Sequence, residues 1–249
     1  AGEKLNVLET QLIPTTQLNE SKLAVHKKSP SLSEKRKKLA EQKKQKIGEK
    51  QHLKAVTLSP QDASDFSNLG IQLKVLGRLD DAEASFRQAI ALKPDYFKAH
   101  NNLGNTLKEL GRLDEAEVSY KQAIALKPDY TLAHINLGGT LKELGILDKS
   151  EASYRQAIVL KPNYAEAHYS LGVLLQEQGK LDEAKASYTQ AIAFKSDYAE
   201  AYNNLGVTLQ ELGKLDEAEA SYRQAIALKP DYAEAHNNLG VTLQDLGKL

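Results

Sequence analysis

Apolar residues near the end of the chain recur with the spacing of a helix face. Within residues 215–230, Ala218, Tyr222, Ala225 and Ile226 stand at positions i, i+4, i+7 and i+8. This is the stripe of an amphipathic helix that buries one side. The charged and polar residues between them are left for the opposite, solvated side. The pattern therefore predicts a helix with one buried face.

A second helix is predicted just before this one. Leu205, Leu209 and Leu212 lie on one side of residues 199–212, and Gly213 follows them. Glycine commonly ends a helix because it adopts the left-handed conformation without steric cost. The two helices and their short turn make one helix-turn-helix unit.

The junction between units is predicted from proline. Pro230 stops the helix before it, and Asp231 is expected to cap the next helix with its side chain. Ser196 replaces the proline in one unit, so we expect a looser junction at residues 195–198.

The unit repeats every 34 residues, with no insertion or deletion. Its Leu-Gly pair recurs at Leu69-Gly70, Leu103-Gly104, Leu137-Gly138, Leu171-Gly172, Leu205-Gly206 and Leu239-Gly240. A fixed period of this length predicts a solenoid, in which each unit packs mainly on its neighbours. We expect five whole units, followed by the first helix of a sixth: residues 63–96, 97–130, 131–164, 165–198, 199–232 and 233–249.

These residues resemble the tetratricopeptide repeat (TPR) family, including the repeat arrays of O-linked N-acetylglucosamine transferases and of bacterial TPR proteins. The residues of unit 199–232 that match the family pattern are Leu205, Gly206, Leu209, Ala218, Tyr222, Ala225 and Pro230. The slot usually given to tryptophan holds His or another aromatic residue, namely Phe66, His100, His134, His168, Tyr202 and His236. The resemblance implies an all-α, right-handed superhelical α-solenoid whose first helices line a concave groove for a protein or peptide partner.

Two small residues explain how the helices of a unit approach each other. Gly206 and Ala218 are expected where the helices cross, because larger side chains there would overpack at a cost of about 1–3 kcal/mol. Tyr222 and its equivalents are expected to fill the interval between units.

The first 62 residues differ in composition from the repeats. They carry 13 Lys/Arg and 7 Asp/Glu, whereas residues 63–249 carry 20 and 26. We interpret residues 1–30 as an extended arm and residues 31–62 as a basic capping helix that resembles a partial repeat. The basic stretch lacks interleaved aromatic residues and an arginine-rich block, so a nucleic-acid partner is not expected. Asn19 begins a weak N-glycosylation triplet.

No residue set predicts catalysis, a cofactor or a metal site. Cysteine is absent, and so are phosphate-binding loops and nucleophile motifs. Histidines that recur every 34 residues would lie about 8–10 Å apart, too far to share one ion. No apolar run reaches the roughly 18 residues of a membrane span. We therefore expect a non-enzymatic protein without catalytic or metal-ligating residues.

The candidate binding residues are those that the packing pattern leaves free. An asparagine recurs on the first helices, and such amides can hydrogen-bond the backbone of an extended peptide. One neighbouring slot holds lysine in the early units and glutamine later, and another holds Lys98 and Leu132 early but Glu166, Glu200 and Glu234 later. The groove is therefore expected to change from more basic to more acidic. The predicted groove residues are Asn68, Asn102, Asn136, Asn204, Asn238, Lys74, Lys108 and Lys142.

The two ends of the array suggest self-assembly. Residues 43–58 align with a second helix of the repeat, whereas residues 233–246 make a first helix without its partner. One copy could therefore complete the unit of the next, in a filament of head-to-tail contacts. The residues predicted for this contact are Ile47, His52, Ala55, Leu58, Leu239, Leu243 and Leu246.

Three functions follow from these observations. The first is a non-catalytic scaffold that binds proteins through the groove. The alternatives are a self-assembling structural protein and the recognition module of a larger glycosyl- or sulfotransferase. The sequence does not identify the compartment. A cytoplasmic location is the default expectation, and an extracellular one applies if the protein forms fibres.

Overall fold

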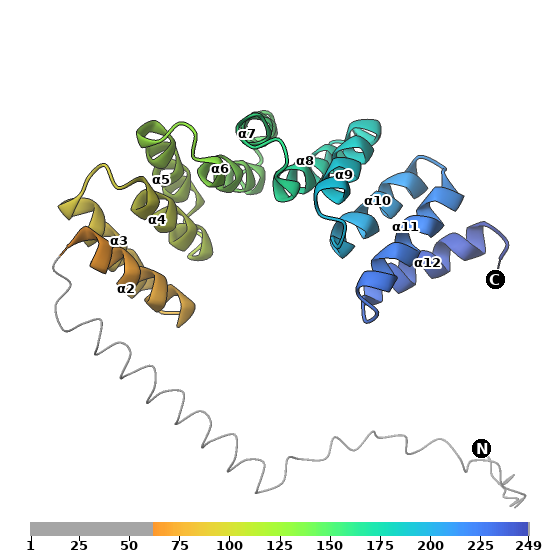
Figure 1. Ribbon diagram of the computed structural model, residues 1–249, viewed down its shortest axis with the longest axis horizontal. Helices are drawn as coiled ribbons and strands as arrows, with labels where there is room; N and C mark the ends of the chain where they lie inside the picture. The colour runs from red at the N-terminus through yellow and green to blue at the C-terminus, as the bar shows by residue number, and fades with distance from the viewer. Residues whose placement is uncertain (1–61, 249) are drawn as a thin grey trace, which may run out of the picture. The chain divides into compact units, whose positions relative to one another are not determined.

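The computed structural model describes residues 62–248, which form eleven helices and no strand in that range (Figure 1). The predicted all-α repeat solenoid is confirmed, with five helix pairs followed by a single helix. The first helices of the units are α2 Ala63–Val75, α4 Phe97–Glu109, α6 Thr131–Glu143, α8 Ala165–Glu177, α10 Ala199–Glu211 and α12 Ala233–Asp245. The second helices are α3 Leu79–Leu92, α5 Leu113–Leu126, α7 Leu147–Leu160, α9 Leu181–Phe194 and α11 Leu215–Leu228.

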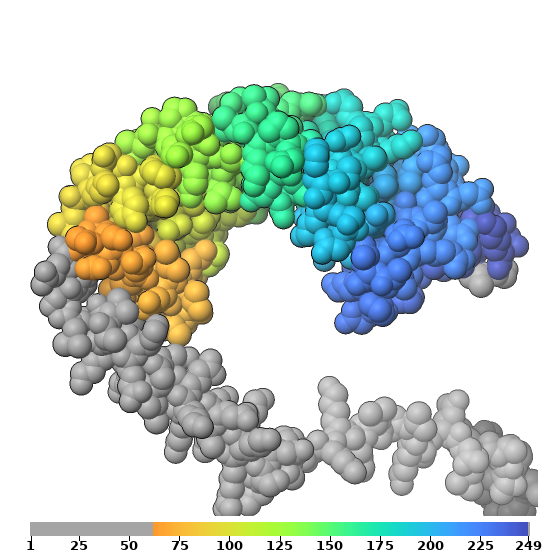
Figure 2. Space-filling model, viewed as in Figure 1, coloured from red at the N-terminus to blue at the C-terminus, as the bar shows by residue number. Residues whose placement is uncertain are grey.

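The helices of the repeat array form two layers. Successive first helices touch each other, whereas no second helix of the described residues contacts another second helix. In a curved stack, the layer whose members touch lies on the inner side. Figure 1 shows α4 and α6 on that side, with α5 and α7 outside them, and Figure 2 shows the hollow that the inner layer borders. The first helices therefore supply the residues that face the groove.

A glycine closes every first helix. Gly213 has a φ of +72°, and five equivalent glycines share this left-handed conformation. Its N–H donates to the carbonyl of Gln210 at 2.9 Å, and the N–H of Lys214 donates to Leu209 at 2.8 Å. These bonds satisfy carbonyls at the helix end. The predicted role of Gly213 is confirmed.

Two expectations about the junctions between units need correction. Asp231 does not cap α12, because the N-cap residue is Tyr232 and makes no capping side-chain hydrogen bond. The chain enters α12 through a backbone turn, in which Tyr232 N–H donates to the carbonyl of Lys229 at 3.0 Å. The junction at Ser196 keeps the geometry of the others, since Lys195 (φ −141°, ψ 89°) matches Lys161 (φ −142°, ψ 86°). The local backbone hydrogen bonds hold this turn without a proline ring.

Each whole unit is held together by an aromatic ring that lies on a glycine. A Cβ atom on Gly104 would come within 2.6 Å of the ring of Tyr120, which is fully buried. The equivalent pairs are Gly70 with Phe86, Gly138 with Tyr154, Gly172 with Tyr188 and Gly206 with Tyr222. The absence of a side chain on the first helix thus makes room for the ring of the second.

The same rings connect one unit to the next. Phe86 belongs to one core cluster with Leu103 and Leu107, which lie in the following unit. Burying a large apolar side chain of this kind contributes roughly 1.5–3 kcal/mol. The ring therefore stabilises both its own helix pair and the stacking of units.

Replacing Gly104 with alanine tests this contact. We expect Gly104→Ala to lower the free energy of unfolding by about 1–3 kcal/mol, because the ring of Tyr120 must move. The matched control is Gly240→Ala, since a Cβ there meets nothing within 4 Å. Urea unfolding followed by circular dichroism should show a loss in the first variant only. Equal stability of the two variants would contradict the packing argument.

The buried hydroxyl of Tyr154 leads to a prediction about the stability of the array at alkaline pH. Burial raises the pKa of its hydroxyl from 10.0 to about 12. A phenol whose pKa is raised by folding contributes stability that is fully present below pH 10 and is lost as the pH rises toward 12. Titration of the tyrosinate absorbance of the wild type should show a tyrosine that ionises with a pKa of about 12. The Tyr154→Phe variant should lack this contribution. Ionisation of Tyr154 near pH 10 in the folded protein would refute this.

Candidate functional site: the inner groove

The candidate site is the inner groove, defined here by four slots of the first helices. In α4 these slots hold Asn102, Asn105, Lys108 and Glu109. Their equivalents recur every 34 residues, so each slot makes a row along the concave wall. Residues three or four apart share a helix face, which is why the four slots point the same way.

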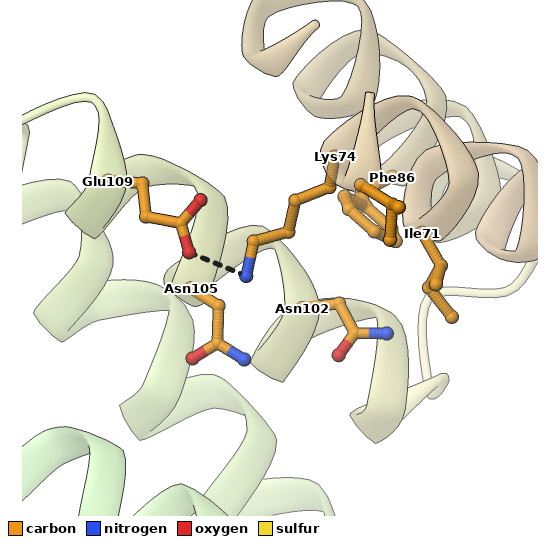
Figure 3. Close-up of a pocket in the computed structure, with 7 residues that line it drawn as sticks. Ile71, Lys74, Phe86, Asn102, Asn105 and Glu109 are labelled. Carbon is orange, nitrogen blue, oxygen red and sulfur yellow. Dashed lines mark ion pairs between the residues drawn. The ribbon is translucent and has the colours of Figure 1, made fainter. Parts of the chain in front are cut away.

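A hollow in this groove lies between α2 and α4 (Figure 3). It has a volume of about 420 Å³ and is lined by Ile71, Lys74, Val75, Phe86, Asn102, Asn105 and Glu109. Two of these residues are exposed apolar side chains, Ile71 at 44% and Val75 at 82%. The lining of the hollow therefore combines apolar side chains with two amides and the ion pair between Lys74 and Glu109.

The three predicted groove lysines lie in one row, and each pairs with a glutamate of the next unit. The Nζ atoms of Lys74 and Lys108 are each 2.8 Å from a carboxylate oxygen, and that of Lys142 is 2.6 Å from one. The partners are Glu109, Glu143 and Glu177, respectively. Exposed pairs of this kind contribute about 0–1 kcal/mol each. The lysine row thus links successive first helices, and the glutamates of the following units neutralise its charge.

Three asparagines of the predicted row bond back to the preceding first helix. The Nδ2 atom of Asn136 donates to Asn101 at 3.0 Å, and that of Asn238 donates to Asn203 at 3.2 Å. Asn204 donates to the hydroxyl of Tyr169 at 3.2 Å. These amides therefore bridge neighbouring units while they line the groove.

The other two asparagines of the row lie near the first unit. Asn102 lines the hollow between α2 and α4, whereas Asn68 is exposed on α2. Within the described part of the chain, the amide of Asn102 has no side-chain partner. It is therefore available to a ligand in the hollow.

An aromatic cluster in the fourth unit was not predicted from the sequence. The ring of Tyr169 lies 4.8 Å from that of Tyr198 and 5.9 Å from that of Tyr188. Burial raises the pKa of Tyr169, so its hydroxyl stays neutral and accepts the bond from Asn204. The available signal was that tyrosine replaces the serine, asparagine or isoleucine of other units in this slot.

The repeating histidines make structural hydrogen bonds. His100 and His168 each place Nε2 close to the carbonyl oxygen of the proline six residues earlier, at 2.9 Å and 2.8 Å. His134 and His236 make the same contact at 2.9 Å. Where Ser196 replaces the proline, Tyr202 replaces the histidine. The ring thus ties the start of a first helix to the preceding turn.

The described residues contain no cluster of three His, Asp or Glu side chains that could hold a metal ion. None of their helices has the length and apolar character needed to cross a membrane. Among the predicted self-assembly residues, Leu239, Leu243 and Leu246 are partly exposed on or just after α12. The others, Ile47, His52, Ala55 and Leu58, lie outside the described residues, as does Asn19.

Sequence reasoning also missed four residues that line the hollow. Ile71 and Asn105 follow the asparagine row by three positions, and Val75 and Glu109 follow the lysine row by one. The helical spacing of i and i+3 was the signal for the first two. All four residues line the hollow only because particular sides of α2 and α4 face each other. The periodicity of one helix does not reveal how two helices are oriented.

Comparisons with known proteins agree with this fold. The family described as TPR repeat matches residues 72–111, 140–179, 175–213 and 210–247, and that described as Tetratricopeptide repeat matches residues 97–130. These segments cover more than half of the chain. No curated protein matches the chain.

Several solved structures are similar. A thermophilic TPR protein from Thermus thermophilus is 27% identical, with a TM-score of 0.57 over 73% of this chain and 99% of its own. YrrB, described as a TPR protein with an unusual peptide-binding site, is 24% identical, with a TM-score of 0.58 over 74% of this chain and 95% of its own. PilW, a type IV pilus biogenesis factor, is 22% identical, with a TM-score of 0.68 over 76% of this chain and 88% of its own.

The family matches, the 34-residue period and the paired helices lead to one conclusion. The chain belongs to the tetratricopeptide repeat family, whose members generally mediate protein–protein interactions and are typically non-catalytic.

Proposed function

We propose that the protein is a non-catalytic scaffold that binds an extended segment of a partner protein in the inner groove. The observation that carries this proposal is the hollow between α2 and α4. Its apolar residues, Ile71 and Val75, are exposed, and the amide of Asn102 stands beside them. A monomer leaves such surfaces open most often where a ligand binds.

The chemistry of the hollow suits a peptide backbone that carries one apolar side chain. An asparagine amide both donates and accepts, so Asn102 can pair with a peptide N–H and C=O at once. The side chain of the ligand would then cover Ile71 and Val75. The peptide-binding site named for YrrB, which shares the fold, supports this proposal by analogy.

The double variant Ile71→Ser/Asn102→Ala tests the proposed site. We expect at least a roughly tenfold loss of affinity, because binding energy concentrates in a few central residues. The full chain is first screened against an arrayed library of random dodecapeptides. The affinity of each peptide that binds is then measured by fluorescence anisotropy for the wild type and the variant.

The matched control for this experiment is Val118→Ser/Gln122→Ala. Both residues are exposed on α5, in the outer layer, and the double change again removes one apolar and one amide group. Control and wild type should bind alike. Binding that survives in Ile71→Ser/Asn102→Ala would reject the hollow as the binding site.

A second function, self-assembly, is favoured by the exposed face of α12. In each whole unit the glycine of the first helix is covered by an aromatic ring, whereas nothing lies within 4 Å of a Cβ on Gly240. Leu243 is partly exposed, although its equivalent Leu209 is only 3% exposed. In each whole unit the second helix covers the equivalent face. We propose that residues 43–58 of another copy supply it.

Sedimentation of the full chain over a range of micromolar concentrations tests this second function. We expect assemblies that shrink in Leu243→Asp, because a buried unpaired charge opposes the contact. Val118→Asp on the outer layer is the control and should assemble as the wild type does. A wild type that stays monomeric throughout would end the proposal.

A further inference from the structure

The inner layer changes its charge halfway along the array. The helices α8, α10 and α12 carry six acidic residues and no lysine or arginine: Glu166, Glu177, Glu200, Glu211, Glu234 and Asp245. The helices α2, α4 and α6 carry three acidic and four basic residues. The first helices of the carboxyl-terminal half are therefore strongly acidic, while those of the other half are close to neutral.

Part of this negative charge is not balanced within the molecule. Glu177 is paired with Lys142 of the preceding unit at 2.6 Å. Glu166 and Glu200 lie 3.8 Å and 3.9 Å from lysines of their own units. In the range 62–248, by contrast, Glu211, Glu234 and Asp245 form no ion pair. Glu211 accepts a hydrogen bond from Gln176 at 3.4 Å and Glu234 accepts one from Asn203 at 3.1 Å, but these neutral amides leave the negative charges uncompensated.

An apolar row runs beside these carboxylates. Val173, Val207 and Val241 occupy one slot of α8, α10 and α12, where α4 has Asn105 and α6 has Gly139. Val241 is 42% exposed, whereas Val173 and Val207 are half-buried, with one side packed on the core beneath them. Each valine stands four residues before an acidic residue, so the two lie on the same helix face. The wall thus offers one apolar contact per unit, and the carboxylate beside it is free of ion pairs in α10 and α12, whereas Glu177 of α8 is paired with Lys142.

The spacing of the units matches an extended ligand. Neighbouring packed helices lie about 8–10 Å apart. A chain in the polyproline II conformation rises about 3.1 Å per residue, and one turn contains three residues. Every third ligand residue would therefore meet the next valine, and the residues between them would face the carboxylates or solvent.

We infer that the carboxyl-terminal half of the inner groove binds a basic extended segment that carries an apolar residue at every third position. This inference rests on the proposed groove function and defines the chemistry of its partner. Val173, Val207 and Val241 receive the apolar residues. Glu211, Glu234 and Asp245 pair with the lysines or arginines between them, which is the charge complementarity that sets specificity at interfaces.

The probes are three fluorescein-labelled dodecapeptides titrated against the full chain. The first is four repeats of Val-Lys-Lys, and the second is four repeats of Val-Glu-Glu. The third has the composition of the first, with its valines in one block. We expect the first to bind at least about tenfold more tightly than the others, and its affinity to fall as salt is added.

A matched pair of variants assigns the effect to the groove. Glu211→Gln/Glu234→Gln/Asp245→Asn should weaken binding of the first peptide by about tenfold, because three exposed ion pairs are lost. The control, Asp114→Asn/Asp148→Asn/Asp182→Asn, removes three exposed carboxylates from second helices of the outer layer. It changes the net charge equally and should bind as the wild type does.

The possible failures are distinguishable. Equal binding of the three peptides, or equal losses in the two triple variants, would overturn the inference about charge and register. The groove function would survive either result if the random dodecapeptides still bind and depend on Ile71 and Asn102. Absence of binding by every peptide would overturn both proposals.

Discussion

The contact between a glycine and an aromatic ring is the constraint on which the rest of the structure depends. The first helix must have no side chain at Gly104 or its equivalents, because the ring of the second helix lies 2.6–2.8 Å from where a Cβ would be. This contact fixes how closely the two helices approach. Since the ring also joins the core of the next unit, it fixes how the units stack.

Exact repetition of that contact produces the groove. Because every unit has the same length and packing, each exposed slot on a first helix falls above its counterpart in the unit before. Single residues thereby become rows of lysine, glutamate, asparagine or valine. Differences between units change the character of the wall along its length. It passes from the apolar hollow at α2 and α4 to the acidic surface of α8, α10 and α12.

The rows have structural roles beside the binding role that we propose for them. The lysine row is engaged with Glu109, Glu143 and Glu177, and three asparagines donate to the helix before them. These weak contacts recur at every junction, so together they restrain the curvature of the inner layer. The surfaces left for a partner are those in which such pairing is incomplete.

The sequence by itself determined the repeat length, the helix pairs and the turn glycines, because these depend on residues close together in the chain. Leu205, Gly206 and Tyr222 carry that information within a single unit. It also predicted that Asn102 and Lys74 belong to the groove, where they line one hollow. Local periodicity is sufficient to say which helix face each residue occupies.

Only the tertiary structure decided how those faces meet. It replaced the expected cap at Asp231 with a backbone turn, and it paired the groove lysines with glutamates 35 residues later. It also brought Ile71 of one helix beside Asn102 of another to make the hollow. The physical reason is that such contacts depend on the distance and rotation between stacked units, which the packing of the rings sets and no single helix pattern contains.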